Sequence, residues 1–199
     1  MVADALAARS GRAIALFASI VVAVIVGDLA LKYLAFRHVA GVPVVVDEQD
    51  PNLVVDPTDL LRRPVYHDPI TVVPGVLALR LTTNTGAVFG IGKGGKWFFV
   101  GVSAVAVGVM LWFFLRSPAS AWVMHAALAL TLAGALGNLY DRLRYNAVRD
   151  MLHLFPTTNL WPWIFNLADA ALVVGVSLLV VVTWWHDVRQ RRRPAPTTA

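Results

Sequence analysis

Long apolar runs separated by polar segments dominate the hydrophobic pattern of the chain. A helix that spans a membrane needs about 20 predominantly apolar residues. Runs of that kind cover about residues 13–36, 97–115, 119–140 and 163–185. The pattern therefore predicts an all-α membrane protein with four transmembrane helices. We expect residues 1–199 to form one integral membrane domain.

The segments that flank the runs predict their arrangement. Only "RSPA" separates the second and third runs, so we expect an antiparallel helical hairpin there. The first run follows Arg9 and Arg12 and leads into "GDLALKYLAF", which has no cleavage site. We therefore expect it to be retained as a helix and not removed as a signal peptide.

Basic residues give a partial indication of orientation. With both termini in the cytoplasm, Arg9, Arg12, Arg116 and the C-terminal arginines lie on the cytoplasmic side. Segments 37–96 and 141–162 also carry basic residues, so the raw count does not favour this orientation. However, a loop of about 60 residues is at the limit beyond which charge stops governing translocation. We expect both termini to be cytoplasmic.

The segment 37–96 combines two patterns. "VPVVV" and "ITVVPGVLALRLTT" are β-branched runs with proline and glycine breaks, which predict a small extramembrane β-sheet, or cradle, between the first two helices. Between them lies an acidic, proline-punctuated insert at about 44–68, which we expect to be a solvated surface loop. The basic tail at 189–199 is typical of a disordered end.

Composition agrees with a membrane location. The chain is 58% hydrophobic, with a mean hydropathy of +0.66, whereas soluble domains are about 45–50% apolar. The absence of cysteine excludes disulfides, thiolate nucleophiles and cysteine metal sites. The net charge of +5 does not predict nucleic-acid binding, because basic residues beside spanning helices more often face anionic lipid headgroups.

Polar residues inside the helices converge on one level. At about 1.5 Å of rise per residue, Asp28, Asp169 and Asn138 lie roughly 22, 24 and 28 Å from the cytoplasmic ends of their helices. Three helices therefore bring polar groups to the outer interface. Asp28 and Lys32 are also four residues apart, which allows an ion pair on one helix face.

An asparagine lies three residues before each of two acids, Asp141 and Asp169. Asn138 and Asp141 are three residues apart, as are Asn166 and Asp169, so each asparagine can hydrogen-bond beside its acid. A lone carboxylate in hydrocarbon costs about 2.5–3.5 kcal/mol even on the gentler insertion scale. These acids therefore need partners, water or a proton.

Paired acids suggest acid–base chemistry. Two close carboxylates cannot both ionise freely and come to share a proton, which is the arrangement aspartic proteases use. The sequence lacks the His-Glu-x-x-His motif of zinc proteases and any serine-nucleophile motif. The alternative is a proton-linked transporter or channel subunit with the acids as a relay. That alternative needs polar groups on both sides of the midplane, and only His125, which we interpret as a helix-packing residue, lies in the cytoplasmic halves.

Four motifs together resemble those of the lipoprotein signal peptidases (signal peptidase II) and occur in the order found in that family, and the similarity covers all four predicted helices. They read "GDLALKYLA", "NTGAVFG", "GALGNLYDRLRYNAVRDMLH" and "FNLADAALV". The resemblance implies an aspartic endopeptidase of the bacterial cytoplasmic membrane with its active site near the outer face. Such an enzyme removes the signal peptide of diacylglyceryl-modified prolipoproteins by cutting before the lipidated cysteine.

The resemblance also implies which residues act. Asp150 and Asp169 correspond to the catalytic dyad, which needs no metal or cofactor. The family is inhibited by globomycin-type cyclic peptides in the substrate site, and we expect a monomer that contacts membrane lipid. The supporting or substrate-binding residues implied are Asp28, Lys32, Asn84, Gly86, Asn138, Asp141, Arg142, Asn166 and Ala168.

Spacing alone favours Asp141, and not Asp150, as the partner of Asp169, because Asp141 ends the third predicted helix beside an asparagine. The resemblance instead gives Asp141 a supporting role, paired with Arg142 or Lys32.

The sequence also departs from the family's usual pattern. The family commonly has Val-Val-Asp-Phe where this chain has Val-Arg-Asp-Met, which places Arg149 beside Asp150. Neighbours in an extended segment point to opposite sides, so we expect Arg149 to face lipid headgroups. Val88 stands where a small residue is more usual, and the insert at 44–68 is longer than typical.

Overall fold

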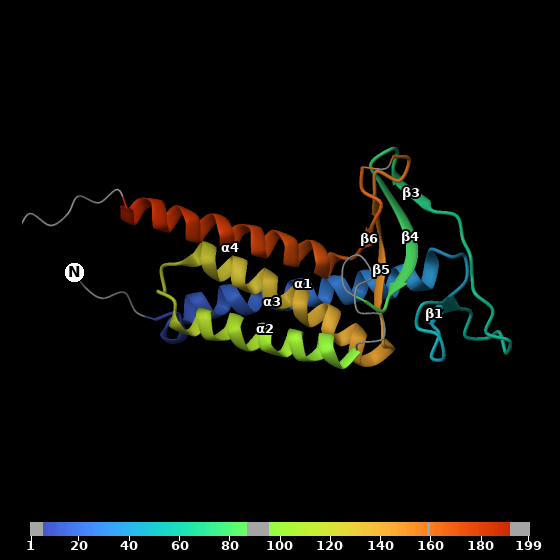
Figure 1. Ribbon diagram of the computed structural model, residues 1–199, viewed down its shortest axis with the longest axis horizontal. Helices are drawn as coiled ribbons and strands as arrows, with labels where there is room; N and C mark the ends of the chain where they lie inside the picture. Colours follow the sequence, from blue (N-terminus) through green and yellow to red (C-terminus); the bar gives the residue numbers. More distant parts are fainter. Residues whose placement is uncertain (1–5, 87–95, 159, 192–199) are drawn as a thin grey trace, which may run out of the picture.

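Four long helices lie side by side along the length of the molecule (Figure 1). The computed structural model describes residues 6–86, 96–158 and 160–191. A short 3-10 helix at Ala7–Arg9 precedes them, and all four are long and apolar enough to cross a membrane. The helices are α1 (Gly11–His38), α2 (Lys96–Arg116), α3 (Trp122–Tyr145) and α4 (Leu167–Arg191).

A small sheet stands at one end of the helices, while the first residues of α1 and the last of α4 lie at the other end (Figure 1). Four antiparallel strands form it in the order β3-β4-β5-β6, and β1 pairs with β2 separately. The strands are β1 (Val45–Val46), β2 (Val54–Val55), β3 (Ile70–Val73), β4 (Leu77–Asn84), β5 (Val148–Leu154) and β6 (Ile164–Phe165).

The four helices and the small extramembrane sheet confirm the predicted fold class. Strands β3 and β4 come from the segment between α1 and α2, where the β-branched runs predict them. Strands β5 and β6, however, come from between α3 and α4. The fourth helix consequently begins at Leu167 and not near residue 163, because Ile164 and Phe165 pair with β5.

Helix α3 continues past the predicted end near residue 140, to Tyr145. Its last turn is polar, and it persists because Asp141 and Arg142 find partners at the sheet end of the molecule. Asn146 then adopts the left-handed conformation, with φ of 59°, and ends the helix. Asparagine is one of the few residues that take this conformation at a helix C-terminus.

The predicted disordered tail at 189–199 is wrong at its start. Arg189 to Arg191 continue α4, and Arg191 forms an ion pair 2.8 Å from Asp187 one turn earlier. Such pairs favour the helix at these positions. Residues 192–199 lie outside the described residues, as does Val88.

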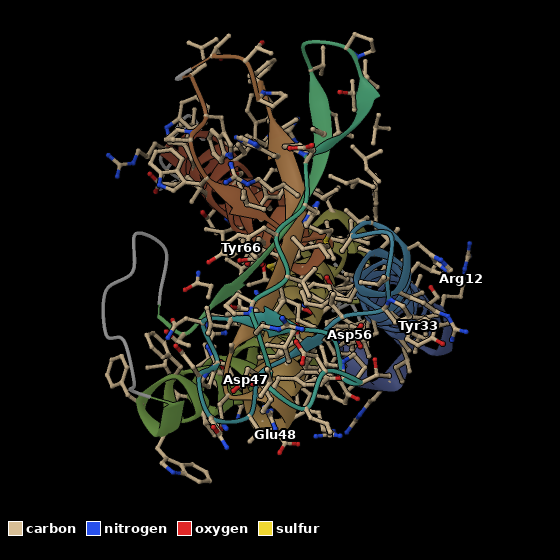
Figure 2. The ribbon with its side chains drawn as sticks, turned by 90° about the vertical axis from the view of Figure 1, so that its right-hand side faces the viewer. Arg12, Tyr33, Asp47, Glu48, Asp56 and Tyr66 are labelled. Atoms are coloured by element: carbon tan, nitrogen blue, oxygen red, sulfur yellow. The ribbon has the colours of Figure 1, made fainter. Side chains whose placement is uncertain are left out.

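The insert at 44–68 is not the fully solvated loop that its composition predicts. Val44, Val46 and Val55 are buried, and the first two join the apolar core at the sheet end. Asp47 is also buried, and it accepts hydrogen bonds from backbone N–H groups and from the side chain of Arg62. These hydrogen bonds hold the pKa of Asp47 below its ordinary value, and the one from the backbone N–H of Asp50 has the largest effect. Figure 2 views the sheet end and shows Asp47 and other acids of the insert on that side.

Helix α3 is the central helix, and it contacts each of the other three. Glycines allow it to approach α4 closely: a methyl group on Gly134 would overlap the carbonyl oxygen of Ala168. A methyl group on Gly175 would lie 2.5 Å from Thr131 Oγ1 and 2.6 Å from its backbone nitrogen. Real carbon atoms do not approach that closely, so the separation of the two helices depends on these glycines.

The end of the bundle where α1 begins and α4 ends has an apolar core of its own, which includes Phe17, Phe114 and Leu128. His125 is completely buried there, with its Nε2 2.8 Å from Ser117 Oγ. Its ring also stacks edge-on against Phe114. The interpretation of His125 as a helix-packing residue is therefore confirmed.

We predict that Gly175→Ala destabilises the protein, because the added methyl forces α4 away from α3. Overpacking of this kind costs about 1–3 kcal/mol, and about 2–4 °C of Tm is lost per kcal/mol in a protein of this size. Thermal unfolding in detergent micelles measures the change. The matched control is Gly108→Ala on α2, where a methyl meets no atom within 4 Å. An equal effect of the two substitutions would contradict close α3–α4 packing.

Candidate active site

A buried lysine joins α1 to α3. Lys32 Nζ lies 2.7 Å from Asp28 Oδ2 and 3.1 Å from Asp141 Oδ2, and all three side chains are completely buried. The ion pair between Asp28 and Lys32 is the one that their four-residue spacing predicts. Lys32 is also the partner of Asp141, one of the two that the sequence suggests.

Arg149 extends this set of charges and does not face headgroups. Its Nη2 lies 2.8 Å from Asp141 Oδ1, and its backbone N–H donates to Asp141 Oδ2 at 3.0 Å. Its guanidinium lies 4.4 Å from the ring of Tyr145. Arg149 and Asp150 are neighbours in β5, and they bind different partners, Asp141 and Asn166, as expected for side chains that point to opposite sides of a strand. The prediction that Arg149 faces headgroups is wrong because the end of α3 lies on the side of β5 opposite Asp150. There Asp141 is a buried acid that needs a second cation besides Lys32.

Together these four side chains form a chain of alternating charge, Asp28–Lys32–Asp141–Arg149, which we call the ion chain. It contains two acids and two bases, so it is neutral as a whole, and each charge lies next to an opposite one. Buried charges are tolerated only when paired and hydrogen-bonded. Asp28 Oδ1 also accepts the backbone N–H of Ala168 at 2.9 Å, which ties the start of α4 to α1.

The start of α4 is built by a reciprocal cap. The side chain of Asn166 accepts the backbone N–H of Asp169 at 2.9 Å, and Asp169 Oδ2 accepts the backbone N–H of Asn166 at 3.2 Å. This is the geometry of a capping box, in which the residue before the helix and its third residue satisfy each other's N–H groups. The three-residue spacing of this pair therefore has a structural cause as well as a chemical one.

Two asparagine amides connect Asp150 to Asp169. Asn166 Nδ2 donates to Asp150 Oδ1, and Asn138 Nδ2 donates to Asp169 Oδ1, each at 2.6 Å. Asn138 Oδ1 accepts from Asn166 Nδ2 at 3.1 Å and from Lys32 Nζ at 3.3 Å. Asn138 therefore bonds to Asp169 and not to Asp141, because Asp141 turns to its two cations.

Both of these acids open onto one cavity of about 430 Å³. Asp150 is 2% exposed. Burial, followed by the nearby charge of Asp169, raises the pKa of Asp150 well above its ordinary value, although the hydrogen bond from Asn166 acts in the opposite direction. The cavity is lined by Asn84, Asn138, Arg142, Val148, Asp150, Leu154, Trp161, Trp163, Ile164, Phe165, Asp169, Ala170, Val173 and Val174.

The segment at the end of β4 contacts α3 beside this cavity, whose lining includes Asn84 and Arg142. Asn84 Oδ1 accepts the backbone N–H of Gly86 at 2.9 Å, and the Gly86 carbonyl accepts from Arg142 Nη2 at 3.1 Å. The Arg142 guanidinium also lies 4.9 Å from the ring of Phe99. These contacts bring the "NTG" motif and the third helix together.

The structure thus brings Asp150, and not Asp141, to the same cavity as Asp169. Asp141 is completely buried within the ion chain. Sequence reasoning also missed the inward position of Arg149 and the aromatic wall from Trp161 and Trp163. Asp141 is buried and shares its lysine, Lys32, with Asp28. An acid in that position needs a second cation, and this is the feature that points to Arg149.

The chain matches known proteins over most of its length. The family model described as signal peptidase (SPase) II matches residues 20–185. The lipoprotein signal peptidase of Geobacter sulfurreducens is 36% identical over 167 residues, which cover 82% of this chain and 98% of that protein. The lipoprotein signal peptidase of Symbiobacterium thermophilum is 40% identical over 141 residues, covering 70% and 88%.

Solved structures support the same fold. One described as a bacterial membrane enzyme has a TM-score of 0.69 at 24% identity, covering 90% of this chain and 93% of that one. Another with the same description has a TM-score of 0.62 at 26% identity, covering 84% and 91%. With four helices able to span a membrane and a family model that covers most of its length, the chain belongs to the signal peptidase II family and is a protease.

Proposed function

We propose that this protein is a membrane aspartic endopeptidase that removes the signal peptides of diacylglyceryl-modified prolipoproteins, cutting before the lipidated cysteine. The observation that carries the proposal is that Asp150 and Asp169 line one cavity and are linked through asparagine amides. The relatives that match the chain are named lipoprotein signal peptidases. The cysteine-free chain offers no thiolate for a covalent route.

The two acids divide the chemistry between them. Burial and the charge of Asp169 favour a proton on Asp150, whereas Asp169 accepts two N–H donors that suit an ionised carboxylate. Asp169 takes a proton from water as the water oxygen attacks the scissile carbonyl carbon, and Asp150 gives its proton to the carbonyl oxygen. The tetrahedral intermediate then collapses: its C–N bond breaks, Asp169 gives its proton to the leaving nitrogen, and a hydroxyl group of the intermediate returns a proton to Asp150. One proton on the pair is required at the start.

The cavity suits a substrate that is part peptide and part lipid. Asn84 and Arg142 are polar groups in the lining that can orient a peptide backbone. Much of the remaining lining is apolar, as acyl chains and an apolar signal peptide require. We expect globomycin-type cyclic peptides to compete for this cavity. The apolar wall is formed by Trp161, Trp163, Phe165, Ala170, Val173 and Val174.

The placement of charges supports an orientation in the bacterial cytoplasmic membrane. Arg9, Arg12, Arg116 and Arg189 belong to the short 3-10 helix, the start of α1 and the last turns of α2 and α4, and the start of α1 and the end of α4 lie opposite the sheet (Figure 1). Charges in short segments beside spanning helices govern orientation, whereas the segment of about 60 residues between α1 and α2 is at the limit of that influence. We therefore place both termini in the cytoplasm and the cavity near the outer face. Since both acids belong to one chain, a monomer is sufficient for the reaction.

We predict that the purified protein releases the signal peptide from a diacylglyceryl-modified prolipoprotein and not from its unlipidated form. Asp150→Asn or Asp169→Asn should lower this rate by about 10³-fold or more, because each removes one half of the acid–base pair. Gel analysis of processing over time measures the rate. Asp187→Asn, an exposed acid on α4, is the matched control and should process normally. Near-normal cleavage by either cavity variant would exclude the dyad.

We also predict the pH dependence of processing. Because the pKa of Asp150 is raised, the pair keeps its proton at pH values where ordinary carboxyl groups have lost theirs. Activity should therefore persist above the pH at which ordinary carboxyl groups ionise, and fall as the pH rises through the raised pKa of Asp150. Asn166→Ala removes a donor that favours the ionised form of Asp150, so the alkaline limb of the residual activity should move to higher pH. A limb that moves down, or stays in place, would contradict this role of Asn166.

A further inference from the structure

The insert at 44–68 lies against the sheet that carries Asp150. Its strand β2 is extended by a hydrogen bond from Val65 N–H to the Val54 carbonyl at 2.9 Å. Val54 and Val65 both pack on the core that contains Leu81 of β4 and Met151 of β5. Figure 2 shows Tyr66, which follows Val65, over the sheet end of the molecule. The insert therefore packs on the core that β4 and β5 share, and it can influence the conformation of both strands.

Strand β4 carries a β-bulge where it passes Asp150. Leu79 pairs with Leu152 and Thr82 pairs with Asp150, so that two residues of β4, Arg80 and Leu81, oppose one residue of β5. A bulge frees a backbone group from the ladder, and it redirects the side chains beside it. The direction of Asp150 therefore depends on how this bulge is held.

The insert supplies the group that holds the bulge. The backbone N–H of Leu81 donates to His67 Nε2 at 3.1 Å, while His67 Nδ1 lies 2.9 Å from the Asp68 carbonyl oxygen. A backbone N–H can only donate and a carbonyl can only accept. The ring must therefore be neutral, with its proton on Nδ1. Leu81 is 7% exposed, so without the imidazole its N–H would lose a partner in a place that water reaches poorly.

We propose that His67 is a positioning residue for the reaction: by accepting the Leu81 N–H it fixes the β4 bulge and so directs Asp150 toward Asn166. This inference rests on the proposed function, and it assigns a role to the insert. The attachment of the insert does not depend on His67 alone, because Thr85, the residue that follows β4, also donates from Oγ1 to Asn52 Oδ1 at 2.9 Å. Loss of the imidazole acceptor therefore leaves the insert attached and frees the bulge.

The kinetic test compares His67→Phe, which keeps a planar ring without an acceptor, with His67→Gln, whose amide oxygen can accept the same N–H. We expect His67→Phe to lower kcat roughly tenfold or more with KM changed by less than about twofold, since misplacement of a reacting group acts on the chemical step. His67→Gln should recover most of the rate. Tyr66→Ala, at an adjacent residue that is 88% exposed, is the matched control and should behave as wild type.

Amide hydrogen exchange of residues 79–84 and 148–152 in the same proteins is the second measurement, and it needs no substrate. Exchange should be faster in His67→Phe and near wild type in His67→Gln. An unchanged kcat in His67→Phe, equal losses in both variants, or unchanged exchange would each overturn the inference. If wild type fails to cleave lipidated prolipoprotein, the proposed function fails instead, and the exchange data still decide whether His67 holds the bulge.

Discussion

The burial of four charges in one neutral chain is the constraint on which the rest of this structure depends. Lys32 is completely buried between Asp28 and Asp141, and Arg149 compensates the remaining charge of Asp141. Removal of one partner from a buried ion pair costs about 3–5 kcal/mol, because it leaves an uncompensated charge. The ion chain therefore accepts few arrangements other than the one in which α1, the end of α3 and β5 meet.

The ion chain positions the cavity acids without neutralising them. Arg149 precedes Asp150 in β5, yet its guanidinium and its N–H are both bound by Asp141. Asp150 is left with an amide donor from Asn166, and Asp169 with an amide donor from Asn138. Amides orient a carboxylate while adding no full positive charge. A buried pair held in this way retains a proton, which is what the proposed reaction requires.

Sequence reasoning succeeded where a pattern had a single physical cause. Four apolar runs have no alternative to four spanning helices, and Asp28 and Lys32 share a helix face by spacing alone. It failed where partners came from distant segments. Spacing favoured Asp141 because nothing local reveals that Lys32 and Arg149 both bind it; only the resemblance to a known family led to Asp150. The capping box at Asn166 was a local pattern, and it could have placed the start of α4.

The sheet shows the same division between local and distant information. The β-branched residues of β3 and β4 predict strands, whereas β5 begins "VRD" and pairs only because β4 presents an edge at the end of α3. The insert is acidic and rich in proline, so its composition suggests solvent exposure. Its buried valines and the contact of His67 with Leu81 depend on a sheet that is assembled from three separate parts of the chain.

A double-mutant cycle on Asp141 and Arg149 tests the central claim most directly. Thermal unfolding would be compared for Asp141→Asn, Arg149→Met and the double variant. Each single substitution leaves the ion chain with a net charge, whereas the double variant is neutral again. We predict that the double variant loses less stability than the sum of the two, by about 0.5–3 kcal/mol. Additive losses, or an Arg149→Met variant as stable as wild type, would contradict the account.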